Sequence, residues 1–275
     1  MKIFHVFFLF FLYSVGMTAS FAYENPKIIS RQSWGADESI RYINSPVWQE
    51  IIEKETKIHI EKGMFQSMSQ VVKYLQKPDY NEKIENYLSI FFGEERIIET
   101  TIYDDNQGKL FWPIQISEKI QGVVIHHTAT EYESDLQAIQ DIYKFHTLGR
   151  KWGDIGYNFI IGKNGEIFEG RAGGEKSVGA HTKRNNIGNI GIVLIGDYDI
   201  HDVPVEQQNS LKNLLVYLGE KYKIDYNKKI YFHEDCIEES CSAEITSQLH
   251  SPIIGHRDSG HTTCPGESVY KLIPG

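Results

Sequence analysis

Residues 157–170 read YNFIIGKNGEIFEG, and this stretch decides the type of sheet. Two apolar runs flank the turn residues Lys163, Asn164 and Gly165, a pattern typical of two strands joined by a tight hairpin. Strands joined by so short a connection run antiparallel, because a parallel pair needs a crossover of about a dozen residues. We therefore expect a sheet that is not all parallel.

Further strands and helices are predicted on both sides of this hairpin. GVVIHH (122–127), IGIVLIGDY (190–198) and PIIGHR (252–257) read as short strands. Residues 134–148 and 205–222 read as amphipathic helices. The first helix spaces five side chains for one face: Leu136, Ile139, Ile142, Tyr143 and His146. This mixture predicts an α/β (α+β mixed) fold, with a central mixed β-sheet flanked by helices.

The N-terminus has the layout of a secretory signal peptide. Lys2 precedes an apolar run over residues 6–17, and Ser20 and Ala22 stand where a signal peptidase reads. The run is shorter than the roughly 20 residues that span a bilayer, although an uncleaved anchor is the alternative. We expect cleavage after the signal peptide 1–22, no membrane span in the mature chain, and a periplasmic or secreted protein.

The rest of the chain divides into an N-terminal segment, 23–117, and a domain over 118–275. Within the first, residues 46–95 show amphipathic helical patterns and predict an added helical insertion, with a lid as the alternative. The formal net charge is −9, and the sequence has no block of lysine and arginine. Nucleic acid is therefore a poor candidate partner.

The cysteines suggest a metal site. Cys236 and Cys241 could form a short disulfide, which leaves Cys264 without a partner in an oxidising compartment. Zinc binds thiolate sulfur and imidazole nitrogen, so Cys264 and His256 could supply two ligands. A third could come from the strand end at His126 or His127, which point to opposite faces, and alternation does not say which. His261 is a rival within the loop, which we expect to be exposed.

Taken together, several stretches resemble one family, the zinc amidases. This family includes phage amidase-type lysozymes, bacterial N-acetylmuramoyl-L-alanine amidases and animal peptidoglycan recognition proteins. The resemblance covers residues 27–42 and about 118–275. It is carried by RQSWGADES, VVIHHTAT, DIGYNFIIGKNGEIFEGR, VGAHTKRNNIGNIGIVLIGDY and GHRDSGHTTCPGE, which follow one another in the order of the family. Recognition proteins of animals carry a cysteine pair after the HHT strand, and its absence here favours a bacterial-type member.

The resemblance implies a zinc site and a reaction. It assigns His126, His256 and Cys264 as the ligands of Zn²⁺, with Tyr157 facing the metal-bound water and the scissile carbonyl. Thr262 would help to stabilise the transition state, with an ordinary loop hydroxyl as the alternative. The implied activity is hydrolysis of the amide between N-acetylmuramic acid and L-alanine in peptidoglycan.

The resemblance also suggests where the substrate binds. His181 and Asn186 lie on a loop whose counterpart in the family contacts the muramyl-peptide. Arg171 could pair with a peptide carboxylate, or it could be solvated. The alternative function is a non-catalytic peptidoglycan-binding receptor or scaffold. Members that only bind typically lack the cysteine ligand, so Cys264 favours the enzyme.

Overall fold

The computed structural model describes residues 25–42, 45–47, 50, 103–104, 110–111, 114–150, 152–182, 185–231 and 249–273. The predicted signal peptide, nearly all of the predicted helical insertion and the Cys236–Cys241 pair lie outside these residues. In the described part of the chain, no helix combines the length and apolar character that crossing a membrane requires.

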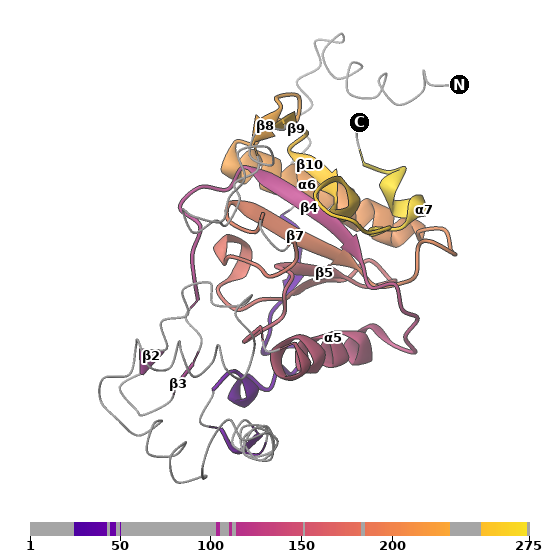
Figure 1. Cartoon of the computed structure of the whole chain (residues 1–275). Helices are drawn as coiled ribbons and strands as arrows, with labels where there is room; N and C mark the ends of the chain where they lie inside the picture. Colours follow the sequence, from indigo (N-terminus) through magenta and orange to yellow (C-terminus); the bar gives the residue numbers. More distant parts are fainter. Residues whose placement is uncertain are drawn as a thin grey trace.

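A six-stranded mixed sheet forms the centre of the fold (Figure 1). Its strands, in spatial order, are β1 (Ile28–Ile29), β6 (Ile167–Glu169), β5 (Phe159–Ile161), β7 (Asn189–Leu194), β4 (Gly122–His127) and β10 (Ile253–Gly255). Only β5 and β6 pair antiparallel in this sheet, and every other neighbouring pair is parallel. The predicted hairpin and the predicted mixed sheet are both confirmed.

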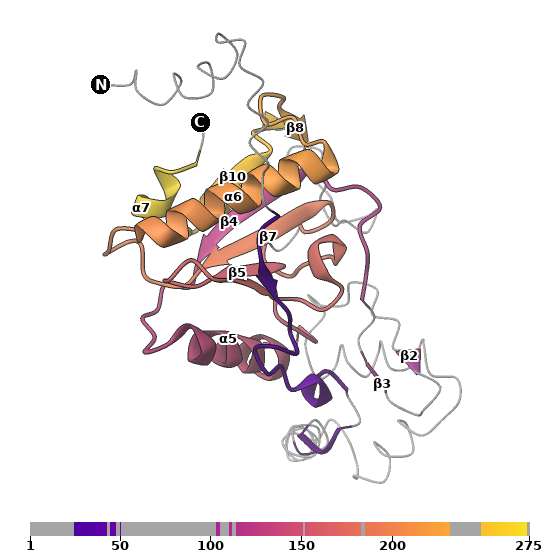
Figure 2. The same cartoon turned by 180° about the vertical axis from the view of Figure 1, so that it is seen from behind.

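Two long helices cover opposite faces of the sheet (Figures 1 and 2). Helix α6 (Val205–Tyr222), as predicted over 205–222, packs its buried leucines against alternate strand residues such as Ile125 and Ile192. Helix α5 (Asp135–Lys144) packs on the other face, against residues such as Val193 and Ile160. Alternation along the strands thus divides the core into two apolar layers.

Helix α5 is shorter than the predicted 134–148. The Ser134 hydroxyl caps its first turn by accepting a hydrogen bond from the Gln137 N–H, and a π-helical turn, η3 (Phe145–Gly149), follows it. Leu136 is 48% exposed, so the prediction that it joins the buried face is wrong. His146 is buried in the π-helical turn. Such turns change the direction of side chains and are frequent at functional sites.

Residues 25–42 of the N-terminal segment pack onto the sheet, which the sequence patterns did not predict. Strand β1 pairs in parallel with β6 at the sheet edge, and Trp34, 3% exposed, donates from its indole Nε1 to the Glu169 carbonyl at 2.8 Å. A two-residue strand is too short to show a periodicity. The shorter elements are η1 (Glu38–Arg41), β2 (Tyr103–Asp104), β3 (Leu110–Phe111), η4 (Gly174–Lys176), β8 (Ile230–Tyr231), β9 (Leu249–His250), η5 (His256–Asp258) and α7 (Glu267–Tyr270).

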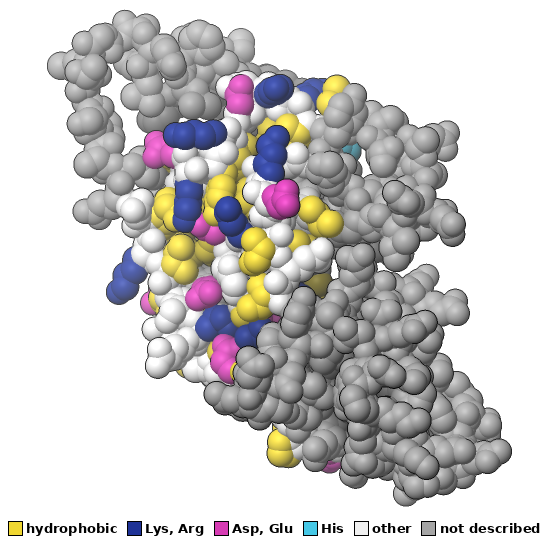
Figure 3. Space-filling view, turned by 90° about the vertical axis from the view of Figure 1, so that its left-hand side faces the viewer, with side chains coloured by type: hydrophobic (Ala, Val, Ile, Leu, Met, Phe, Trp, Pro, Cys, Tyr) yellow, Lys and Arg dark blue, Asp and Glu magenta, His cyan; other side chains and the backbone are white. Residues whose placement is uncertain are grey.

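One face of the molecule carries hydrophobic side chains gathered in a band, with lysine and arginine side chains around it (Figure 3). Among the hydrophobic residues that remain exposed are Ile114 and Ile116, which precede β4 in the chain. The Ile116 backbone forms an isolated antiparallel bridge with Ser177, so the residues before β4 are held against the chain that follows η4.

Candidate metal centre

Two histidines and one cysteine converge at one edge of the sheet. His126 lies near the end of β4, and His256 follows β10, its parallel neighbour. Because parallel strands end at the same edge, the two imidazoles meet there, with ring centroids 4.7 Å apart. Cys264 returns to this edge eight residues after His256. One ligand atom from each of the three residues lies within 4.8 Å of those of the other two.

The strand register resolves which of the two adjacent histidines joins this cluster. His126 pairs with Val193, whose side chain lies in the apolar layer under α5, whereas His127 pairs with Leu194 in the layer under α6. The His127 imidazole accepts a hydrogen bond at Nδ1 from the Tyr198 N–H at 3.2 Å, on that second face. His261 is exposed and is not part of the cluster, as expected.

Hydrogen bonds within the loop bring Cys264 back to the strand end. The Arg257 N–H donates to the Cys264 carbonyl at 2.8 Å, and the Thr262 hydroxyl oxygen accepts from the Cys264 N–H at 3.1 Å. The Asp258 carboxylate accepts from the Gly255 N–H at 2.8 Å and from the Tyr270 hydroxyl at 2.6 Å. Thr262 is exposed, and its observed contact is with the backbone of the cysteine.

The electrostatics of the cluster favour neutral donors when no cation is bound. Burial, together with neighbouring His181 and His256, holds the pKa of His126 well below its usual range, and burial also lowers the pKa of His256. Burial raises the pKa of the Cys264 thiol to about 12, against the opposing effect of the His127 backbone N–H. Two neutral imidazoles and one thiol fit zinc, which would offset the desolvation of the thiolate as the thiol proton leaves.

Tyr157 lies beside the cluster, and its role toward the substrate stays a prediction. Its ring centroid is 5.0 Å from that of His126 and 5.4 Å from that of His146. Burial, reinforced by Cys264, raises the pKa of the Tyr157 phenol. The hydroxyl therefore stays protonated at neutral pH and can donate a hydrogen bond.

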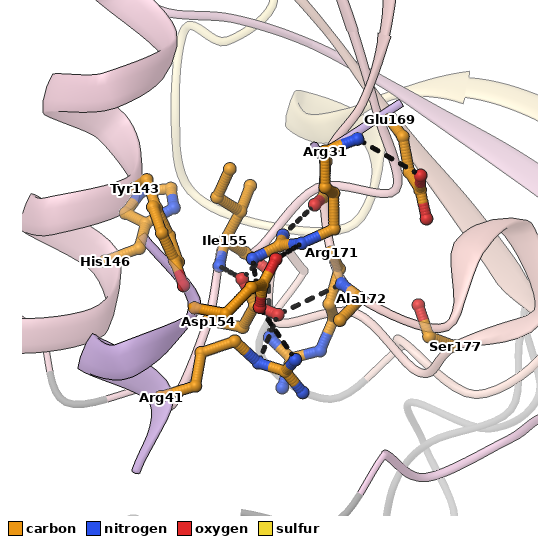
Figure 4. Close-up of polar contacts among 12 residues, drawn as sticks. Arg31, Arg41, Tyr143, His146, Asp154, Ile155, Glu169, Arg171, Ala172 and Ser177 are labelled. Carbon is orange, nitrogen blue, oxygen red and sulfur yellow. Dashed lines mark hydrogen bonds and ion pairs between the residues drawn. The ribbon is translucent and has the colours of Figure 1, made fainter. Parts of the chain in front are cut away.

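The loop that carries Tyr157 is held by a charged group, the Asp154 cluster, which we define as Arg31, Glu38, Arg41, Asp154 and Arg171. Figure 4 shows Arg31, Arg41, Asp154 and Arg171 of this cluster. The Asp154 carboxylate accepts from the N–H groups of Ile155 and Ala172, at 2.7 and 3.0 Å. It also pairs with Arg31 at 3.0 Å and with Arg41 at 3.1 Å. Asp154 begins the DIGYNF motif, and no feature of the sequence pointed to its role in this cluster.

Arg171, which follows β6, also contacts this loop. Its guanidinium donates to the backbone carbonyls of Ile155, at 2.9 Å, and Trp152, at 3.3 Å, and burial lowers its pKa. Arg171 is partly exposed, so solvation of part of its guanidinium stays an alternative. Its pairing with a peptide carboxylate stays a prediction. His146 supports the same loop, because its Nδ1 accepts a hydrogen bond from the Gly156 N–H at 3.1 Å.

The two loop residues predicted to bind substrate are both buried, at 6% exposure for His181 and 3% for Asn186. The Asn186 side-chain oxygen accepts from the N–H groups of His181 and Thr182, at 2.8 and 3.0 Å. His181 Nδ1 lies 3.1 Å from His126 Nε2. Burial lowers the pKa of His181 to about 3, while contact with the Asn189 backbone acts in the opposite direction. Their contact with substrate stays a prediction, and the contacts observed are internal.

A family model described as N-acetylmuramoyl-L-alanine amidase matches residues 117–267 of the chain. The chain belongs to this amidase family. Its relatives include peptidoglycan-recognition protein SC2 of Drosophila melanogaster, 32% identical over 68% of this chain and 91% of the relative. Peptidoglycan-recognition protein LB of the same organism is 35% identical over 52% of this chain and 66% of the relative, just under two thirds of its length. Among solved structures, N-acetylmuramoyl-L-alanine amidase LysC from Clostridium intestinale URNW is 27% identical, with a TM-score of 0.44 over 58% of this chain and 87% of that one.

The matched region, residues 117–267, contains all three residues of the metal cluster, and also Tyr157 and Thr262. The N-terminal segment with Arg31 and Trp34 lies before the matched region, although it packs against it. The resemblance stated from the sequence is thus confirmed at the level of the family.

Proposed function

We propose that this protein is a zinc-dependent N-acetylmuramoyl-L-alanine amidase, which hydrolyses the amide between N-acetylmuramic acid and L-alanine in peptidoglycan. The observation that carries the proposal is the convergence of His126, His256 and Cys264 on one point. Three protein ligands of nitrogen and sulfur type are the number and kind that catalytic zinc sites use. Membership of the amidase family and the names of its recognition-protein relatives support peptidoglycan as the substrate.

The chain would supply three ligands and two hydrogen-bond donors. When bound, zinc supplies a Lewis acid that polarises an amide carbonyl and activates water at neutral pH. Tyr157 keeps its proton because burial raises its pKa, and it can donate to the carbonyl oxygen as negative charge develops there. The Thr262 oxygen already accepts from the Cys264 N–H, which leaves the hydroxyl proton free to be donated to the substrate.

We further propose that the protein is exported, as a bacterial-type member that works in the periplasm or outside the cell. The signal-like residues 1–22 support export. Peptidoglycan lies outside the cytoplasmic membrane, so an exported enzyme would meet its substrate. A second candidate function is peptidoglycan binding without turnover, which the recognition-protein relatives favour by name. Cys264 supports the enzyme over the receptor, because binding-only members typically lack this cysteine.

Purified peptidoglycan incubated with the protein, with and without a chelator, tests the proposal. We expect zinc-dependent release of stem peptides with a free L-alanine amine, detected by mass spectrometry. Cys264→Ser should abolish both bound zinc and release. His261→Ala, a matched change in the same loop outside the cluster, should preserve both. Binding to the wall without release by the zinc-loaded protein would favour the receptor instead.

A further inference from the structure

We propose that His181 is a positioning residue for the metal centre: it accepts a hydrogen bond from His126 Nε2 and so fixes the ring and the tautomer of that ligand. This inference rests on the metal site of the proposed function. It assigns to His181 an internal contact in addition to the substrate contact that the resemblance implies.

The two nitrogens of His126 face different partners. Nδ1 lies 3.6 Å from the Cys264 sulfur and therefore faces the ligand cluster. Nε2 lies 3.1 Å from His181 Nδ1, with the two rings close to perpendicular at 83°. A neutral imidazole that offers the Nδ1 lone pair to a metal carries its proton on Nε2. That N–H then points at His181 Nδ1, which must act as the acceptor.

Two glycines form a slot that holds the His181 ring. A Cβ atom added at Gly179 would lie 2.4 Å from His181 Cδ2, and one at Gly191 would lie 2.5 Å from the same atom. A side chain at either position would therefore displace the imidazole. Gly191 is itself fixed, because its N–H donates to the Asn158 side-chain oxygen at 2.8 Å and its carbonyl accepts from the Asn158 N–H at 2.9 Å.

The backbone of His181 is fixed as well. Asn186 accepts from the His181 N–H at 2.8 Å, and this bond closes the loop between the two residues. The loop and the slot together leave the imidazole with one orientation, in which Nδ1 faces the metal ligand. Such support for a ligating histidine orients its ring and raises its basicity, and its loss commonly weakens metal binding by about 10–100-fold.

The other nitrogen of His181 shows that this arrangement is not explained by packing alone. With Nδ1 as acceptor, the proton sits on Nε2, which is buried and, apart from the contact of this ring with the Asn189 backbone, has no hydrogen-bond partner within the described residues. A buried donor with so little compensation is destabilising, whereas an apolar side chain of similar size would avoid that cost. The contact with His126 gives a reason for a histidine here.

Nitrogen-detected histidine NMR on the zinc-loaded full chain tests the inference without a substitution. Zinc content is measured first, and we expect one ion per chain. The spectrum should show His126 protonated on Nε2 and His181 protonated on Nε2, with an acceptor shift at His181 Nδ1. A zinc-loaded chain in which His181 carries its proton on Nδ1 would overturn the inference alone. A chain that binds no zinc at this site would refute the proposed function, and this inference with it.

Two substitutions separate hydrogen bonding from packing. His181→Asn keeps an acceptor near the position of Nδ1, whereas His181→Leu fills the slot without one. Zinc affinity, from competition with a chelator, should fall about 10–100-fold in H181L and stay within about threefold of the wild type in H181N. Wild-type affinity in H181L, or equal losses in both variants, would overturn the inference. If H181L does not fold, the tautomers that NMR detects in the wild-type chain decide whether His181 accepts the hydrogen bond.

Discussion

Replacing Asp154 should release the loop that carries Tyr157 while leaving the three metal ligands in place. The Asp154 carboxylate joins the N–H groups of Ile155 and Ala172 to the guanidinium groups of Arg31 and Arg41. Its side chain is 5% exposed and that of Arg31 is 8% exposed, so both charges are shielded from water. Removing the carboxylate leaves two buried N–H groups and two arginines without this partner.

The expected size of the effect follows from this burial. Breaking a buried ion pair by removing one partner costs about 3–5 kcal/mol of unfolding free energy. We expect a loss in this range for Asp154→Ala, and a smaller loss for Asp154→Asn, whose amide oxygen still accepts one hydrogen bond. For a protein of this size, each kcal/mol lowers Tm by about 2–4 °C.

Glu38→Gln provides the matched control. Glu38 pairs with Arg31 and Arg41 in the same cluster, at 2.7 and 3.0 Å, but its side chain is 42% exposed. Exposed ion pairs contribute about 0–1 kcal/mol, so this variant should unfold within about 1 kcal/mol of the wild type. Urea unfolding of the zinc-loaded proteins measures the loss of unfolding free energy in the Asp154 variants and in Glu38→Gln.

The functional readout is activity at constant zinc content. Asp154→Asn should retain one zinc ion per chain yet release stem peptide more slowly, because Tyr157 is no longer held beside His126. If Asp154→Ala unfolds within about 1 kcal/mol of Glu38→Gln, the cluster does not support this loop and the reasoning is refuted.

Three further outcomes are expected. Tyr157→Phe should lower the rate of release by about 10²–10³ with zinc content unchanged, and an unchanged rate would exclude the phenol from the reaction. In metal-free protein, burial lowers the pKa of His146 and His181 to about 3, below the roughly 6.5 of the unfolded chain. The stability that these neutral histidines allow is therefore present above pH 6.5 and lost as pH falls, and each histidine should cost about 2 kcal/mol of unfolding free energy between pH 6.5 and 5. A urea-unfolding free energy that does not change over this range would contradict the prediction. Gly191→Ala should weaken zinc binding because its added Cβ would displace the His181 ring. Gly260→Ala should not, because its added Cβ would lie 3.7 Å from the nearest atom, His256 Nε2, which is ordinary van der Waals contact. Equal zinc affinities of the two variants, measured by chelator competition, would count against the slot.

Local sequence patterns predicted the elements that are long enough to show a period. The KNG turn predicted the one antiparallel pair of the sheet, and the pattern over 205–222 predicted α6 with its bounds. The strand at Ile28–Ile29 was missed because two residues have no period, and only pairing with β6 defines it. Leu136 was placed in the core because its spacing fits the buried face, but in the structure it lines an open pocket with Trp34 and Phe168 and stays 48% exposed.

The candidate site could be predicted less completely, and for a different reason. Residue type and spacing suggested His256 and Cys264, but the choice between His126 and His127 needed a resemblance or the register with Val193. The surroundings of His181 were not predictable from its loop, because the slot needs Gly191 of strand β7 beside the nearby Gly179. A histidine in a loop reads as exposed until the fold places a strand against its ring.

The contacts of Arg31, Trp34 and Arg41 show that the folded unit around the metal cluster begins before residue 117. The predicted boundary at residue 117 separates Arg31 and Arg41 from Asp154, and Trp34 from the Glu169 carbonyl. A chain cut at this boundary would keep every metal ligand but leave the buried Asp154 carboxylate without its two cations. An unpaired buried charge would then destabilise the loop that carries Tyr157. Residues 25–42 therefore pack as part of the same folded unit as the sheet that carries the metal cluster.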